Sequence, residues 1–129
     1  MIYFLWFIGF LLFLSVVINL SYFLFYREIH RLERVAEEYP GYADVRYKLG
    51  RILHQKGKNT EARRYLEEAI KIYPYYLEAH QELFHVLDDI GDKAAAVQLL
   101  IRLKPLAENQ HDKNMIAFVR EHLDRYEKS

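Results

Sequence analysis

The first 26 residues contain no Asp, Glu, Lys or Arg, whereas residues 27–129 carry all 18 basic and all 18 acidic side chains. Crossing the hydrocarbon core of a membrane takes about 20 apolar residues, and this run supplies more. A secretory signal peptide has a shorter apolar core behind a basic start, and it ends at a cleavage site of small residues. No Lys or Arg precedes this run and no such site follows it. We therefore expect a retained transmembrane anchor over residues 1–26.

The orientation of this anchor follows from the charges beside it. Arg27, Arg31 and Arg34 lie directly after the apolar run, and positive charge is retained on the cytoplasmic side of a membrane. We expect a single-pass protein with its N-terminus outside and residues 27–129 in the cytoplasm. A periplasmic domain, or one on the outer membrane of an organelle, stays open as an alternative.

Four polar residues inside or beside the apolar run share one helix face. Their spacing of i, i+4, i+7 and i+11 places them in one row. An Asn amide in lipid has no water to satisfy it, so a neighbouring helix often does. We interpret the row as a contact face for an integral membrane protein or a second copy. The alternative is that Asn19 reaches the headgroups and the tyrosines form an interfacial belt. The predicted face is Ser15, Asn19, Tyr22 and Tyr26.

The charged part of the chain repeats itself at a fixed offset of 34 residues. The residues Leu49, Leu53, Gly57, Ala62 and Leu66 recur as Leu83, Leu87, Gly91, Ala96 and Leu100. In the other direction, Leu66, Tyr73, Pro74 and Tyr76 match Leu32, Tyr39, Pro40 and Tyr42. A period of this length with these residue types resembles the tetratricopeptide repeat, a helix–turn–helix unit.

The match to the family pattern is partial. The first unit reads Arg46-x2-Leu49-Gly50-x2-Leu53, followed by Ala62-x3-Leu66 and Pro74. Its Leu, Gly, Ala and Pro residues agree with the family pattern, whereas the Trp, Tyr and Phe of that pattern are replaced. In the second unit Phe84 stands in place of the glycine and Glu108 in place of the closing proline. Pro105 lies three residues too early, so we expect the second helix of that unit to end early or its loop to be reshaped.

The resemblance implies an all-α fold, in which one N-terminal transmembrane helix continues into a short superhelix of tetratricopeptide hairpins. No Gly or Pro interrupts residues 22–38, so the junction should be rigid. The expected helices cover about 2–39, 43–56, 60–73, 77–90, 93–104 and 112–127. The expected domains are the anchor (1–26), a half-repeat (27–42), repeat 1 (43–76), a divergent repeat 2 (77–110) and a capping helix (111–129). In the cap, Ala117, Phe118 and Leu123 should pack inward, and Asp112, Lys113, Arg120, Glu121, Asp124 and Arg125 should face water.

No motif for chemistry emerges from the rest of the sequence. Cysteine is absent, which excludes disulfides, thiolate nucleophiles and cysteine-ligated metals. The formal net charge of zero argues against binding nucleic acid through its phosphates. Glu82 and His85 have the i, i+3 spacing of di-iron bundles, but no second such pair follows. We expect no catalytic residue, no metal, no cofactor and no small-molecule substrate; a metal- or haem-handling role for His54, His80 or His85 is a minor alternative.

The resemblance also implies where a partner would bind. In this family the first helix of each repeat lines a concave groove. Tyr47 and Arg51 stand where the family's binders of chaperone tails carry Lys and Asn, so that activity is not indicated. The expected groove residues are Asp44, Tyr47, Lys48, Arg51, Gln55, Glu78, Gln81, Glu82, His85 and Asp89.

Two hypotheses for function follow. The first is a non-enzymatic, membrane-anchored module that recruits or positions a protein partner at the membrane. The second is a permanent accessory subunit of a larger membrane complex, held mainly through the transmembrane helix. Residues 27–76 carry a net charge of +3 and residues 77–129 a net charge of −3. The membrane-near half therefore suits anionic lipid headgroups or an acidic partner.

Overall fold

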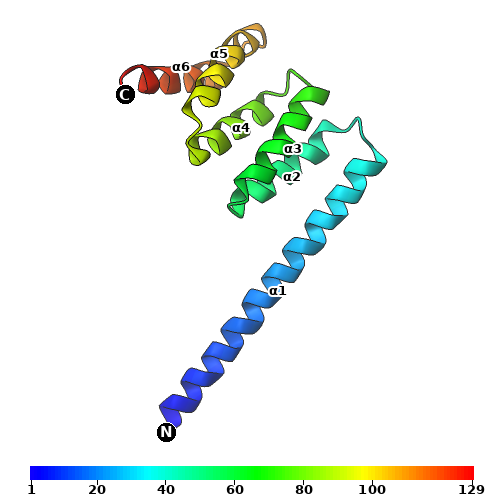
Figure 1. Ribbon diagram of the computed structural model, residues 1–129, viewed down its shortest axis with the longest axis vertical. Helices are drawn as coiled ribbons and strands as arrows, with labels where there is room; N and C mark the ends of the chain where they lie inside the picture. The colour runs from blue at the N-terminus through cyan, green and yellow to red at the C-terminus, as the bar shows by residue number, and fades with distance from the viewer.

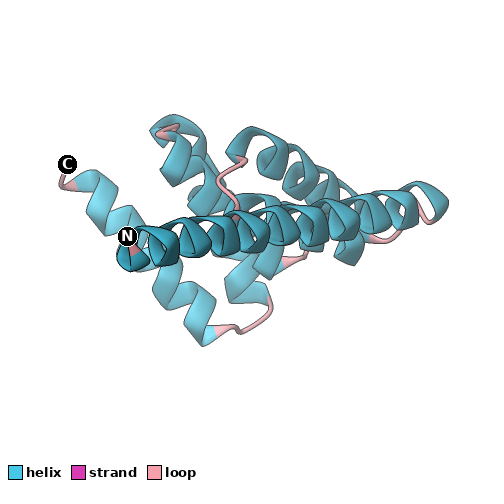
Figure 2. Ribbon diagram, turned by 90° about the horizontal axis from the view of Figure 1, so that it is seen from below, coloured by secondary structure: helices cyan, strands magenta, loops and turns pink.

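The computed structural model describes residues 1–129 and is entirely helical, as expected from the sequence. One long helix extends away from a stack of five shorter ones (Figure 1), and short loops join them all (Figure 2). The N-terminus lies at the free end of the long helix, and the last helix lies at the opposite end of the molecule. The helices are α1 (Ile2–Glu38), α2 (Ala43–Gln55), α3 (Asn59–Ile72), α4 (Leu77–Ile90), α5 (Lys93–Asn109) and α6 (Lys113–Glu127).

Helix α1 is unbroken over 37 residues and is therefore about 55 Å long. It is the one helix long and apolar enough to cross a membrane, and its apolar stretch is not buried by the rest of the chain. Its last third behaves differently, because Ile29, Leu32 and Ala36 are buried against the repeat domain. A single rigid element thus joins the exposed apolar segment to the packed core.

The remaining helices stack in sequence order, and each packs mainly on its neighbours along the chain. This is the arrangement of a solenoid, in which a hairpin hides its apolar stripe only against the next one. The expected breaks are confirmed. Gly57 and Gly91 have φ angles of +75° and +84°, which only glycine adopts without strain. Helices α1 and α3 end before Pro40 and Pro74.

Two hydrogen bonds fasten the end of α1 to the first hairpin. The hydroxyl of Tyr65 donates to Glu33 Oε1 at 3.0 Å, and Arg46 Nη2 donates to the carbonyl oxygen of Ala36 at 3.3 Å. Tyr65 is itself buried in the core. These contacts make residues 29–36 the first layer of the stack, in the place where a half-repeat was expected.

The expectation of an early end to α5 is wrong, because the helix continues through Pro105 to Asn109. Proline lacks the N–H that would bond to the carbonyl of Ile101. Ile101 and Pro105 both face solvent, where water can satisfy that carbonyl. Beyond the proline, Leu106 and Ala107 pack into the core. The burial of this last turn offsets the hydrogen bond that proline removes.

One expected contact in the capping helix is also wrong. Ala117 is exposed, whereas Met115 and Val119 are the buried residues of α6. Asp112 caps the helix, since its carboxylate accepts a hydrogen bond from the Met115 N–H. Asp112 is therefore half-buried rather than solvated. Phe118 and Leu123 do pack against the core, and the five other charged residues face water as expected: Lys113, Arg120, Glu121, Asp124 and Arg125.

At Gly50, α2 lies directly against Leu66 of α3, which provides a test of the packing. A Cβ atom at Gly50 would lie 2.5 Å from Cγ of Leu66, which is fully buried. We predict that Gly50→Ala lowers the free energy of unfolding by about 1–2 kcal/mol, since overpacking outweighs the gain in helix propensity. Thermal unfolding followed by circular dichroism in detergent measures this. Gly41→Ala is the control, because a Cβ there meets nothing within 4 Å; equal stability of the two variants would contradict the prediction.

Candidate partner-binding groove

The expected groove is built on α2 and α4, the first helices of the two hairpins. Tyr47 of α2 contacts Tyr76, the residue just before α4, with 5.0 Å between ring centroids. The Tyr76 hydroxyl donates to Asp44 Oδ1 at 3.0 Å, and burial together with this bond raises the pKa of Tyr76. The guanidinium of Arg51 lies 5.6 Å from the centre of the Tyr47 ring. Three of the predicted residues, Asp44, Tyr47 and Arg51, therefore belong to one connected cluster.

A second cluster joins the other ends of α2 and α4 through a histidine that the groove prediction did not include. His54 Nδ1 lies 2.7 Å from Glu82 Oε1, and His54 Nε2 lies 2.7 Å from Asp89 Oδ2. Burial lowers the pKa of His54, but the hydrogen bonds to Asp89 and Glu82 outweigh it, so the pKa is raised above its usual 6.5. Both ring nitrogens act as donors when the imidazole is protonated. Glu82 and Asp89 are thus occupied within the protein.

A cavity of about 380 Å³ opens between α1 and α2. Its charged lining is mostly basic. Glu28 is neutralised by Arg31 at 2.7 Å, and Lys48 pairs with Asp44 at 3.0 Å. Arg51 has no carboxylate partner, so it is the cation in this wall that is available to a ligand. The full lining is Glu28, Arg31, Leu32, Lys48, Arg51, Ile52 and Gln55.

The predicted residues on α4 do not form one open surface. Glu78 is exposed and Gln81 is half-buried. His85 is partly covered by α6: its ring lies 5.6 Å from that of Phe118 and 6.4 Å from that of His122. Burial lowers the pKa of His85. Helix α6 therefore covers this part of the predicted groove and leaves the end near Tyr47 and Arg51 open.

The sequence contained a signal for the missed histidine. Glu82 follows His54 by 28 residues, which is six fewer than the repeat period of 34. Asp89 follows His54 by 35 residues, which is one more than that period. These offsets connect adjacent helices of a repeat stack, so an oppositely charged pair at either distance is a candidate contact.

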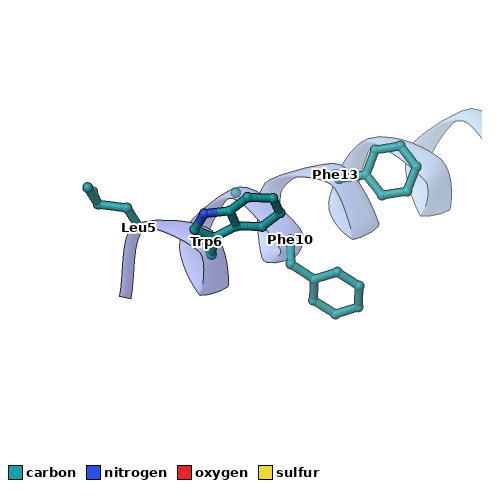
Figure 3. Close-up of a pocket in the computed structure, with 5 residues that line it drawn as sticks. Leu5, Trp6, Phe10 and Phe13 are labelled. Atoms are coloured by element: carbon teal, nitrogen blue, oxygen red, sulfur yellow. The ribbon is translucent and has the colours of Figure 1, made fainter. Parts of the chain in front are cut away.

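On α1, Ser15 and Asn19 of the predicted polar face contact no residue of the repeat domain, whereas Tyr26 lies beside Lys58. The side-chain amide of Asn19 donates to the carbonyl oxygen of Ser15 at 2.8 Å, and its own oxygen accepts no hydrogen bond. Elsewhere on the helix, large side chains surround a notch of about 520 Å³ at Gly9. Figure 3 shows Trp6, Phe10 and Phe13 spreading in different directions around it. The helix thus offers both a polar row and an apolar notch.

Comparisons with known proteins bear on the fold of the repeat domain. Residues 53–113 match the family model of the tetratricopeptide repeat. The repeat domain has the tetratricopeptide fold. Among solved structures, the one described as the crystal structure of MamA protein is similar, with a TM-score of 0.60 and 26% sequence identity. The match covers 66% of this chain and 46% of that one, so this chain spans less than half of the MamA structure. No curated protein matches the chain significantly.

The fold supports a role in protein–protein interaction, the usual role of tetratricopeptide repeats.

The His54 bridge gives a pH-dependent prediction. Since the folded pKa is raised, the bridge stabilises the protein fully below about pH 6.5, and this stabilisation is lost as the pH rises through the folded pKa. We predict that His54→Gln lowers the free energy of unfolding by about 1–2 kcal/mol at low pH and by less at high pH. Denaturant unfolding across this range measures the difference. His111→Gln is the control, because His111 is exposed and forms no ion pair; a difference that does not change with pH would contradict the prediction.

Proposed function

We propose that this protein is a non-enzymatic, membrane-anchored tetratricopeptide-repeat protein that binds a protein partner and positions it at the membrane. The supporting observation is the double use of α1. Its uncharged residues 1–24 are exposed, while Ile29, Leu32 and Ala36 are buried in the first layer of the repeat stack. A helix that is apolar on all sides suits lipid as its surroundings.

The rigid junction determines what such a protein can do. A flexible linker would let a tethered domain search a volume above the membrane. Here α1 forms both the anchor and one wall of the cavity at Arg51, so a partner bound at Arg51 is held at one height and one orientation. This favours positioning over capture at a distance.

The charges indicate what kind of partner segment fits. Arg51 projects into the cavity between α1 and α2 without a carboxylate partner, beside the aromatic ring of Tyr47. An acidic segment would supply the missing negative charge. The positive flank from Arg27 to Arg34 favours a cytoplasmic repeat domain.

A specific observation favours a second candidate, a permanent accessory subunit of an integral membrane complex. The oxygen of the Asn19 side chain accepts no hydrogen bond, and Ser15, Tyr22 and Tyr26 lie in the same row. In lipid this row would be satisfied by a neighbouring helix. For this second candidate, contacts of α1 inside the membrane supply most of the binding free energy, and contacts in the groove supply little.

Two sets of substitutions separate these candidates. We predict that Arg51→Glu weakens partner binding by about 10-fold, because the reversed charge repels an acidic segment. Co-purification from the native membrane in mild detergent, quantified by mass spectrometry, measures this. Arg102→Glu is the matched control, since Arg102 is an exposed, unpaired arginine on α5 that undergoes the same change of charge. Tyr47 is left intact because its ring packs against the core.

We predict a different result for the accessory subunit. Ser15→Leu with Asn19→Leu should then release the chain from the complex, with a loss of about 5-fold in recovered partner. Val16→Leu with Val17→Leu is the control within the same apolar run. An effect of Arg51→Glu alone supports the positioning module, and an effect of the membrane pair alone supports the subunit. If neither set changes recovery, both candidates are wrong.

A further inference from the structure

The turn between α2 and α3 brings two lysines against the end of the apolar segment. Lys56 Nζ lies 5.3 Å from the centre of the Phe25 ring, and Lys58 Nζ lies 5.9 Å from it. Lys58 Nζ also lies 5.3 Å from the centre of the Tyr26 ring. In Figure 1 this turn is the tip of the hairpin that points along α1 toward its N-terminal end. Residues far apart in the sequence therefore meet at one level of the molecule.

The positions of the two lysines are fixed by the backbone of the turn. Gly57 adopts a left-handed conformation, the N–H of Lys56 donates to Ile52 at 3.2 Å, and the N–H of Lys58 donates to Leu53 at 2.9 Å. Both side chains leave this hydrogen-bonded turn, and their ammonium groups lie against aromatic rings in cation–π contact. Neither lysine forms an ion pair with a carboxylate, although 18 acidic residues are present in the chain. Two positive charges are thus placed together without compensation.

A cavity of about 230 Å³ lies between these lysines and α1. It is lined by Ser21, Tyr22, Phe25, Lys56 and Lys58. The hydroxyl groups of Ser21 and Tyr22 form no hydrogen bond within the protein, so both are free to donate. Two ammonium groups and two hydroxyl donors beside an apolar ring form a set that fits a phosphate group attached to something apolar.

The position of the cavity along α1 decides what carries that phosphate. The last uncharged residues of the run are 21–26, and the first charge is Arg27. Because about 20 residues cross the hydrocarbon core, Ser21 to Tyr26 lie where the acyl chains give way to headgroups. A lipid headgroup is therefore present at this level as soon as the segment enters a membrane.

We propose that Lys56, Lys58, Ser21 and Tyr22 bind the phosphate of an anionic phospholipid at the membrane surface. The apolar rim at Phe25 faces the beginning of the acyl chain. A bound lipid would join the α2–α3 hairpin to the membrane at a second point, beside α1 itself, and so fix the tilt of the repeat domain. This inference rests on the proposal that residues 1–26 span the membrane.

The test uses the full chain in nanodiscs made of equal amounts of phosphatidylcholine and phosphatidylglycerol. Native mass spectrometry after ejection from the disc measures which lipid stays bound. We expect the wild-type chain to retain phosphatidylglycerol preferentially, and Lys56→Gln with Lys58→Gln to reduce that preference by about 5-fold for each lysine. Ser21→Ala with Tyr22→Phe should reduce it further without changing any charge.

The matched control is Arg27→Gln with Arg34→Gln, which removes the same charge from the same juxtamembrane region outside the cavity. A smaller effect of this control supports a defined site. An effect equal to that of the lysine pair would mean general attraction to an anionic surface and would overturn the site. Unchanged lipid preference in the lysine variant would overturn it as well.

Two further measurements test the membrane anchor and the source of the bound phosphate separately. Flotation of every variant with liposomes of pure phosphatidylcholine reports membrane insertion alone, so failure of the wild-type chain to float would contradict the anchor and not the lipid site. Titration of the detergent-solubilised chain with inorganic phosphate tests a free anion. Binding as tight as that of the lipid would overturn the assignment to a headgroup.

Discussion

The burial of Ile29, Leu32 and Ala36 against the first hairpin is the interaction on which the rest of this structure depends. Without it, α1 would be an isolated helix and the hairpin α2–α3 would expose one apolar side. Two full repeats are fewer than the three or so that a solenoid normally needs for stability. The end of α1 and helix α6 supply the missing layers, one at each side of the stack. The anchor is therefore a structural part of the repeat domain rather than an appendage to it.

This arrangement links the position of every charged group to the membrane. Because α1 is rigid, the turn at Gly57 lies beside Phe25, and the cavity at Arg51 lies further along the helix beside Arg31. The two lysines of the α2–α3 turn therefore lie at the end of the apolar segment, and Arg31 and Arg51 lie further from it. The half of the chain nearest α1, residues 27–76, carries a net charge of +3.

The parts of the fold that could be predicted are those encoded by nearby residues. Gly57 and Pro74 end helices through their own backbone geometry, so the bounds of α2 to α4 follow from the sequence. The extent of α5 did not follow, because Pro105 is tolerated only when Ala107 beyond it is buried by a helix from elsewhere in the chain. The buried stripe of α6, formed by Met115 and Val119, did not follow for a similar reason, since it depends on which side of the helix faces α5.

The candidate sites show the same division between local and long-range information. A repeat pattern assigns Asp44, Tyr47 and Arg51 to one side of a first helix, but it does not reveal that His54 reaches across to α4. The angle between α1 and the first hairpin decides which residues meet Lys56 and Lys58. That angle is set by the packing of Leu32 and by the hydrogen bond from Tyr65 to Glu33, which join residues more than 30 positions apart. A weakened Tyr65–Glu33 contact would therefore move the lysines away from Phe25 and disrupt the lipid site without altering any residue that lines it.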